Sequence, residues 1–334
     1  MNKNNQSIGI IGTGMALPKC KFKNDDFVKL GLETSDDWIT SRTGIKQRYI
    51  AKEEATSDLA YEAAENAIKD AGINKEDIDC IIVATTTPDY PSFPSVACLV
   101  QNGLGLDKIP AFDVSAACTG FIYAMEIAEK MMRSGEYKNI LVIGADTLSK
   151  ICNWKDRSTV VLFGDGAGAV VLGAVKKGYG IISSKLGAYG SGFDKLIVPK
   201  GGSREPLTAD NIDDDGRYIQ MDGKGVYRFA VKVIVKVVEE ALSNIGMKKE
   251  DISFMIPHQA NVRIIDYARE KLGLSREQVY VNIDSYGNTS AATIPIALNE
   301  VCNKNLIQNG DILVTVGFGA GLTFGTNVIK WYSK

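Results

Sequence analysis

The strongest constraint on the fold is an internal repeat in the sequence. Residues 65–83 and 239–257 are identical at about eight of nineteen positions, including a shared Lys-Glu-Asp-Ile segment. Residues 139–142 and 311–314 form a second similar pair at nearly the same separation. Because similarity at a fixed spacing indicates that one structural unit occurs twice, we expect two equivalent halves. The apolar pattern breaks at residues 176–180, so the predicted halves are residues 1–178 and 179–334.

The alternation of segments predicts an α/β fold. Short runs rich in β-branched residues predict strands, and the segments between them, such as residues 57–71, carry apolar side chains at helical spacing. This alternation favours layers of sheets and helices, in which loops of the two halves meet at the centre. The expected strands are residues 8–11, 78–84, 140–143, 167–172, 252–256, 279–283, 312–316 and 326–329.

One stretch does not follow this alternation. Residues 199–223 are polar and rich in Gly and Asp, which predicts a long excursion over the surface. Such an excursion is either a lid over a site or a plain solvated loop, and the sequence favours neither.

The composition excludes several classes of function. The chain has 38 basic and 40 acidic residues and a net charge of −2, so its charge gives no reason to expect nucleic acid as a partner. It has no apolar stretch long enough to span a bilayer, and its start lacks the apolar core of a signal peptide. We therefore expect a cytoplasmic protein without membrane contact.

The cysteine and histidine content argues against a metal site. The six cysteines include no C-x-x-C pair, which predicts free thiols rather than disulfides or a zinc site. The chain has one histidine, His258, so His-rich metal sites are excluded. Glycine clusters at residues 9–14, 164–168 and 317–321 lack the spacing of a dinucleotide-binding loop, and turns or close backbone approach explain them better.

Cys118 is a candidate nucleophile. It lies where an apolar strand gives way to a helix of small and apolar residues. The positive end of a helix dipole favours a thiolate, which makes such a cysteine nucleophilic near neutral pH. The alternative is an inert cysteine of the core, which is the commoner role of a lone cysteine among small residues.

Three other segments place polar residues at strand ends or helix starts. His258 follows an apolar strand, where sites form in α/β sheets, although a purely structural histidine is as common. Asn288 lies between a strand and a helix of small residues, where capping is the alternative role. Trp38 and Arg42 share a short helix and would suit a purine beside a phosphate, although tryptophan usually serves packing.

Together, six motifs make the sequence similar to a known family. In chain order they are TSDDWITSRTGI, DVSAACTGF, DRSTVVLFGDGAGAVVL, PHQANVRII, GNTSAA and GFGAGLTFG, and they cover nearly the whole chain. This set resembles β-ketoacyl-[acyl-carrier-protein] synthase III, the initiating condensing enzyme of bacterial type II fatty-acid synthesis. The resemblance implies the thiolase fold, a duplicated five-layered αβαβα sandwich, which agrees with the internal repeat.

The resemblance also implies a Cys-His-Asn triad. Cys118 would be the acylated nucleophile, and His258 and Asn288 would donate hydrogen bonds while a malonyl thioester loses CO2. The backbone N–H groups of Cys118 and Ala320 would form the oxyanion hole. The implied reaction condenses an acyl-CoA primer with malonyl-acyl carrier protein (malonyl-ACP) to give a 3-oxoacyl-ACP, and it needs no cofactor.

Binding roles follow from the same matching. The residues implied for coenzyme A are Thr34, Trp38, Arg42, Arg157 and Asn261. Those implied for docking the acidic carrier protein are Gln259, Ala260, Asn261, Val262, Arg263, Arg228 and Lys271. For the acyl pocket, Phe318 is implied beside the nucleophile, and Phe93 would reach into the pocket of the partner subunit in a homodimer. Departures from the family pattern occur at Trp154, Ser158 and Phe324, and they concern only coenzyme A binding.

Two alternatives accompany this interpretation. A relative with the same triad could perform another condensation, of the quinolone or polyketide type. A noncatalytic carrier-binding relative would keep Trp38 and Arg263 but lose Cys118 or His258, and this chain has both of the latter. Primer length does not follow from the sequence, because scattered apolar side chains set the depth of the pocket.

Overall fold

Two β-sheets organise the chain, which is described for residues 6–333 by a computed structural model. In spatial order the first sheet contains β1 (Ile8–Ala16), β7 (Asp165–Ala174), β6 (Ile140–Thr147), β4 (Cys80–Ala84) and β5 (Ala111–Val114). The second contains β11 (Phe254–Pro257), β12 (Ile312–Gly319), β13 (Thr323–Lys330) and β8 (Gly180–Ala188). The chain passes from the first sheet to the second between Ala174 and Gly180.

The repeated sequence forms the same unit in both halves. Helix α3 (Thr56–Ala71) leads through a short 3-10 turn into β4, and α6 (Gly223–Ser243) leads through an equivalent turn into β11. In each turn the Asp of Lys-Glu-Asp-Ile accepts a backbone N–H, at 2.9 Å for Asp77 and 2.7 Å for Asp251. The shared motif therefore caps the turn that sends the chain from helix to strand.

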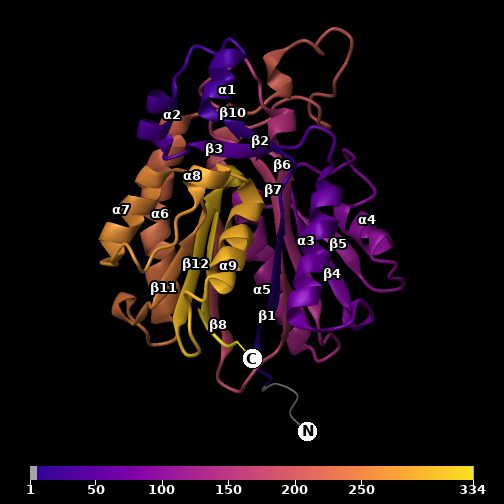
Figure 1. The fold of residues 1–334 in the computed structure, drawn as a ribbon, viewed down its shortest axis with the longest axis vertical. Helices are drawn as coiled ribbons and strands as arrows, with labels where there is room; N and C mark the ends of the chain where they lie inside the picture. The colour runs from indigo at the N-terminus through magenta and orange to yellow at the C-terminus, as the bar shows by residue number, and fades with distance from the viewer. Residues whose placement is uncertain (1–5, 334) are drawn as a thin grey trace.

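Helices and sheets alternate in five layers (Figure 1). Helices α3 and α4 (Val96–Gly103) cover the outer face of the first sheet, and α6 and α7 (Val262–Leu272) cover that of the second. Between the sheets lie α5 (Gly120–Arg133) and α9 (Thr293–Asn303). Because both faces of each sheet are covered, inner strands such as β4 are buried at every residue. The predicted αβαβα architecture is confirmed.

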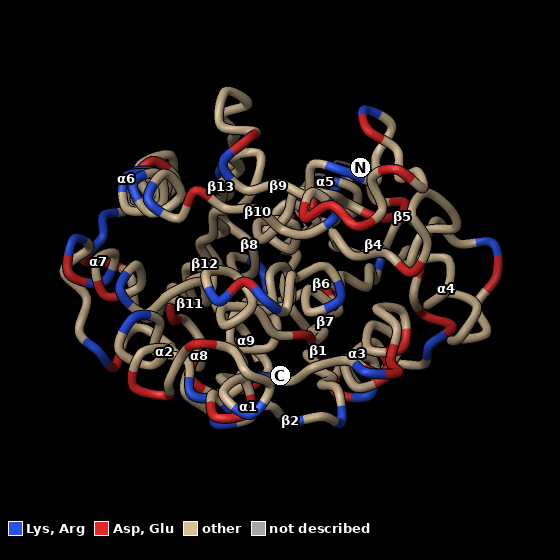
Figure 2. Tube along the Cα trace, turned by 90° about the horizontal axis from the view of Figure 1, so that it is seen from above, with Lys and Arg blue, Asp and Glu red and all other residues tan. Residues whose placement is uncertain are grey.

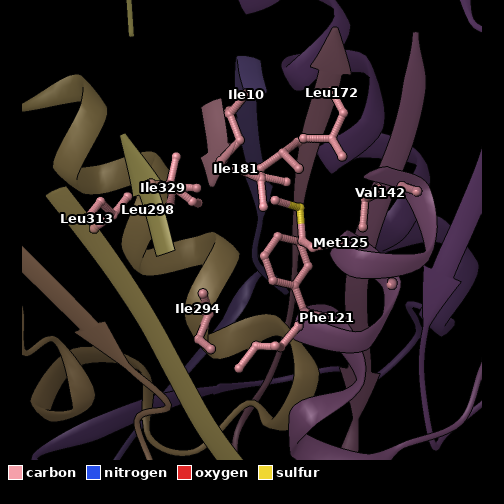
Figure 3. Close-up of a cluster of buried hydrophobic side chains, with 14 of the residues drawn as sticks. Ile10, Phe121, Met125, Val142, Leu172, Ile181, Ile294, Leu298, Leu313 and Ile329 are labelled. Carbon is pink, nitrogen blue, oxygen red and sulfur yellow. The ribbon is translucent and has the colours of Figure 1, made fainter. Parts of the chain in front are cut away.

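The central layer holds a core that both halves share. Phe121 and Met125 of α5 belong to the same buried cluster as Ile294 and Leu298 of α9 (Figure 3). Side chains from both sheets point into this cluster, so the halves cannot separate without exposing it to water.

Smaller elements lie above the sheets in Figure 1. They are β2 (Cys20–Lys23), α1 (Asn24–Lys29), α2 (Asp36–Thr43), β3 (Gln47–Ile50), β9 (Leu196–Ile197), β10 (Gln220–Met221) and α8 (Ile283–Tyr286). β9 and β10 pair at the base of the 199–223 excursion, and residues 201–210 within it are all exposed. Charged residues are spread over the outer helices and loops (Figure 2).

The structure departs from the predicted strands in several places: one expected strand is absent, and β8 and the short strands β2, β3, β9 and β10 were not predicted. The strand expected at residues 279–283 is wrong: Val279 makes a single bridge to Met255, and Ile283 already begins α8. Strand β8 was not predicted, because it contains Gly, Ser and Lys and lies at the edge of its sheet, where a strand is only partly buried. Among residues 6–333, no helix has the length and apolar character that crossing a membrane requires.

Gly144 on β6 tests how closely the halves pack. A Cβ at this position would lie 2.2 Å from the carbonyl oxygen of Ala291. Because both groups belong to buried backbone, we expect Gly144→Ala to lower the free energy of unfolding by about 1–3 kcal/mol in urea denaturation. Gly202→Ala is the matched control, since its Cβ would meet no described atom within 4 Å. Equal stabilities of the two variants would contradict this packing.

Candidate active site

Cys118 lies at a sharp strand-to-helix connection. After β5, a 3-10 turn at Ala117–Thr119 leads directly into α5. Ala117 has φ +47°, in the left-handed region that residues with a side chain rarely adopt. This strain is typical of functional sites, and it positions a thiol that is only 6% exposed.

Burial controls the ionisation of this thiol. The pKa of Cys118 is raised to about 12, chiefly by burial; hydrogen bonds from the Ser290 hydroxyl and the Cys118 N–H oppose this rise, and the nearby Asp146 carboxylate adds to it. The helix start therefore does not make Cys118 a thiolate in the free protein, contrary to the expectation from the dipole. At neutral pH the group is a thiol.

His258 follows directly after β11, as predicted. Its backbone N–H donates to the carbonyl oxygen of Val316 at 2.7 Å, and its ring packs edge-on against Phe318 with the centroids 5.5 Å apart. The ring Nδ1 lies 2.7 Å from the Oγ1 of Thr293. Burial lowers the pKa of His258 to about 3, so the imidazole is neutral at physiological pH.

Asn288 is held by backbone groups on either side. Its N–H donates to Leu162 and its carbonyl oxygen accepts from Gly164, at 2.9 and 3.0 Å. The side-chain Oδ1 accepts the Ser290 N–H at 2.9 Å. This bond forms an Asx turn before the 3-10 turn Ser290–Ala292, whose N-cap residue is Thr289, and it leaves the amide Nδ2 of Asn288 as a donor.

One cavity brings these three residues together. This first cavity, about 170 Å³, is lined by Cys118, His258, Asn288 and Phe318. Leu196 and Met221, at the base of the 199–223 excursion, also line it.

A second cavity, about 160 Å³, meets the first at Cys118. Its walls include Leu148, Ile151 and Ile219, with Ala320 and Ser290 near the thiol. Cys118 therefore lines both cavities.

The residues predicted for coenzyme A lie together. Two guanidinium groups lie close to Trp38, with the Cζ atoms of Arg42 and Arg157 at 4.5 and 5.0 Å from its ring centroid. Arg157 also donates to the backbone carbonyl that precedes Thr34, at 2.6 Å. Asn261 donates to the backbone carbonyl of Arg42 at 3.1 Å and lines the first cavity. This cluster therefore connects the molecular surface to the cavity.

The segment predicted to dock a carrier protein divides into buried and exposed parts. Arg228 of α6 and Arg263 and Lys271 of α7 are exposed, and basic segments recur along both helices (Figure 2). Ala260 and Val262 are half-buried. Gln259 differs from the expectation: it is buried, and its amide donates to the carbonyl oxygens of Pro257 and Tyr280. Its side chain is not accessible to a partner protein, because these hydrogen bonds to backbone carbonyls hold it in the interior.

The remaining predicted positions lie outside the cavities. Phe93 is 85% exposed, on the loop between β4 and α4. Trp154 packs against Phe22 and Phe27, and its indole N–H donates to the carbonyl oxygen of Ser149. Ser158 bonds to Asp156, and Phe324 stacks on Tyr189.

Asp146 is a site residue that the sequence reasoning missed. Its carboxylate is fully buried at the end of β6 and accepts bonds from the Thr86 N–H at 2.8 Å and the Thr87 hydroxyl at 2.9 Å. It also accepts the Ala291 N–H at 3.2 Å, so it joins the loops of both halves. An acid within the apolar run 140–147 was the available signal. Among the described residues, no three His, Cys, Asp or Glu side chains are grouped to hold a metal ion.

Comparison with known proteins points to one family. The profile for 3-oxoacyl-[acyl-carrier-protein (ACP)] synthase III matches residues 112–190, and the profile for its C-terminal part matches residues 242–331. The β-ketoacyl-[acyl-carrier-protein] synthase III of Caldanaerobacter subterraneus subsp. tengcongensis is 54% identical, over 97% of each chain. That of Natranaerobius thermophilus is 53% identical, over 96% of this chain and 98% of the relative.

Solved structures agree with this. 3-Oxoacyl-[acyl-carrier-protein] synthase III from Aquifex aeolicus superposes with a TM-score of 0.90 at 46% identity, over 97% of this chain and 100% of that one. A priming β-ketosynthase from the R1128 polyketide pathway gives 0.88 at 31% identity, over 98% of this chain and 96% of that one. The predicted thiolase-like fold is confirmed.

The raised pKa of Cys118 predicts how its reactivity depends on pH. Because only the thiolate reacts, we expect alkylation of Cys118 by iodoacetamide to rise about tenfold per pH unit between about pH 7 and 10. Peptide mass spectrometry after brief treatment at each pH measures this rate. A rate that levels off below pH 8 would mean that the start of α5, not burial, sets the ionisation of this thiol.

Proposed function

Because this chain belongs to the 3-oxoacyl-[acyl-carrier-protein] synthase III family, we propose that it condenses an acyl-CoA primer with malonyl-ACP and so initiates fatty-acid synthesis. The observation that carries the proposal is the first cavity, where Cys118, His258 and Asn288 meet although they come from different halves of the chain. Both halves must fold together to form this site, and the proposed reaction needs all three residues.

In the first half-reaction, Cys118 takes the acyl group from coenzyme A. Its sulfur attacks the thioester carbon, the bond from that carbon to the sulfur of coenzyme A breaks, and the thiol proton of Cys118 ends on coenzyme A. The backbone N–H groups of Cys118 and Ala320 stabilise the oxyanion that forms in between. The second cavity, with apolar walls at Leu148, Ile151 and Ile219, is suited to hold the acyl chain.

In the second half-reaction, malonyl-ACP loses CO2. The electron pair of the broken C–C bond forms an enolate, whose oxygen gains negative charge. The ring of His258 and the Nδ2 of Asn288 donate hydrogen bonds to this oxygen. The carbanion then attacks the acyl carbon on Cys118, and the departing Cys118 thiolate regains a proton from solvent. Burial keeps His258 neutral, so it acts as a hydrogen-bond donor and not as an acid.

The route of coenzyme A supports the same assignment. Trp38 near Arg42 and Arg157 supplies an aromatic ring for adenine and cations for phosphates, and Asn261 continues toward the first cavity. The exposed face of α6 and α7 would receive the acidic carrier protein.

We further propose that the protein is a cytoplasmic homodimer that needs no cofactor. In the dimer, exposed Phe93 would enter the acyl pocket of the partner subunit. The two predicted halves, residues 1–178 and 179–334, would each supply part of the site, with Cys118 in one and His258 and Asn288 in the other.

Acyl transfer to Cys118 tests the first half-reaction. Incubation with acetyl-, isobutyryl- or octanoyl-CoA, without a malonyl substrate, should attach the acyl group to the peptide that contains Cys118. Intact and peptide mass spectrometry identify the modified residue and rank the primers. Cys98→Ser removes an exposed thiol and should leave the labelling unchanged. Acylation of another cysteine in Cys118→Ser would refute the assignment.

Reversal of charge at Arg263 tests the docking surface. We expect Arg263→Glu to slow condensation with malonyl-ACP much more than acylation by acyl-CoA, because only the former docks an acidic protein. The advantage of the unmodified protein should shrink above about 0.15 M salt, where the Debye length is about 8 Å. Lys69→Glu, on the exposed side of α3, is the control. Equal losses with both substrates, or a loss insensitive to salt, would place Arg263 in the structure of the site instead.

A further inference from the structure

The hydroxyl of Thr293 contacts the imidazole ring of His258. Thr293 is the first residue of α9 and is 3% exposed. Its Oγ1 lies 2.7 Å from the Nδ1 of His258 and 3.0 Å from the carbonyl oxygen of Ser290. Both neighbours can accept its proton, but a hydroxyl has only one to donate.

The other hydrogen bonds of the two acceptors indicate which of them accepts the hydroxyl proton of Thr293. The carbonyl oxygen of Ser290 already accepts the backbone N–H of Thr293, so it is satisfied without the hydroxyl. The Nδ1 of His258 is also the nearer of the two acceptors. A neutral imidazole carries one proton on its two ring nitrogens, and the low pKa of His258 keeps it neutral. If Nδ1 accepts, the proton must be on Nε2.

We propose that Thr293 is a positioning residue that donates to the Nδ1 of His258 and thereby holds the ring in its Nε2–H form. This inference rests on the proposed function, in which His258 donates a hydrogen bond to the enolate oxygen. The opposite arrangement, with Nδ1–H donating to Thr293, would present the lone pair of Nε2 to an oxygen that gains negative charge. That form would repel the developing charge instead of stabilising it.

The side-chain amide of Asn288 is also oriented by the segment that leads into Thr293. The Ser290 N–H occupies Oδ1 of Asn288 and leaves its NH2 group as the donor. Ser290 itself has φ +51°, a strained conformation at the start of the 3-10 turn Ser290–Ala292, which leads into Thr293. The residues from Ser290 to Thr293 therefore orient both proposed donors before any substrate binds.

The single histidine makes this inference directly measurable. In full-length protein labelled with ¹⁵N-histidine, every imidazole signal comes from His258. We expect ¹⁵N NMR at neutral pH to show an unprotonated Nδ1 and a protonated Nε2 in the unmodified protein and in Thr293→Ser, which keeps the hydroxyl. Thr293→Val keeps the shape but removes the donor, so its signals should shift toward the Nδ1–H form.

The kinetic consequence should be confined to the second half-reaction. We expect Thr293→Val to slow CO2 release from malonyl-ACP at least about tenfold, since a wrong tautomer disables a catalytic histidine. Acylation of Cys118 by acetyl-CoA should change less than about twofold, and Thr293→Ser should restore CO2 release.

The inference is overturned by an Nδ1–H form in the unmodified protein, or by identical ¹⁵N signals in Thr293→Val and the unmodified protein. Equal losses of acylation and CO2 release in Thr293→Val would show a merely structural role. If Thr293→Val does not fold, the tautomer in the unmodified protein and in Thr293→Ser still decides. Failure of the proposed function is distinguishable, because the unmodified protein would then release no CO2 from malonyl-ACP whatever its tautomer.

Discussion

The active site depends on one buried carboxylate that joins the two halves. Asp146, at the end of β6, accepts hydrogen bonds from the loop after β4 and from the backbone of Ala291 in the other half. Burial raises the pKa of this carboxyl, and the surrounding hydroxyl and amide donors offset the cost. Close approach of backbone at Gly144 and Gly168 lets residues 291–296 pack directly on the first sheet. The position of Asn288 and the start of α9 follow from this contact.

Burial of the reactive groups determines the chemistry of the site. Cys118 and His258 are both buried, and burial moves their pKa values in the directions that keep each group neutral. The resting site therefore has no thiolate–imidazolium pair. In the proposed mechanism, charge appears only as bonds break, and fixed dipoles stabilise it: N–H groups at Cys118 and Ala320 in one step, and His258 with Asn288 in the other.

Much of the fold and of the candidate site could be predicted from the sequence, because both are indicated by the internal repeat and by local sequence patterns. The Lys-Glu-Asp-Ile repeat predicted two equivalent helix–turn–strand units, and both are present. Cys118 lies at a helix start and His258 at a strand end, as predicted, whereas Asn288 lies between α8 and the 3-10 turn Ser290–Ala292; the structure brings all three to one cavity.

What the sequence could not predict depends on contacts between distant segments. Asp146 and Thr293 act through buried hydrogen bonds to residues far along the chain. The periodicity of a sequence does not indicate which distant residues will be hydrogen-bond partners. The resemblance implied that Gln259 docks the carrier protein, but hydrogen bonds to backbone carbonyls hold its amide in the interior. The ionisation of Cys118 also depends on burial from all sides, which the start of α5 alone does not reveal.

In the proposed mechanism, His258 and Asn288 serve the loss of CO2, whereas Cys118 serves the transfer of the acyl group. Rates of Cys118 acylation by acetyl-CoA and of CO2 release from malonyl-ACP, measured in His258→Ala and Asn288→Ala, test it most directly. We expect both variants, folded by circular dichroism, to acylate Cys118 still but to release CO2 at least about 100-fold more slowly. Normal CO2 release, or an equal loss of both half-reactions in folded protein, would contradict it.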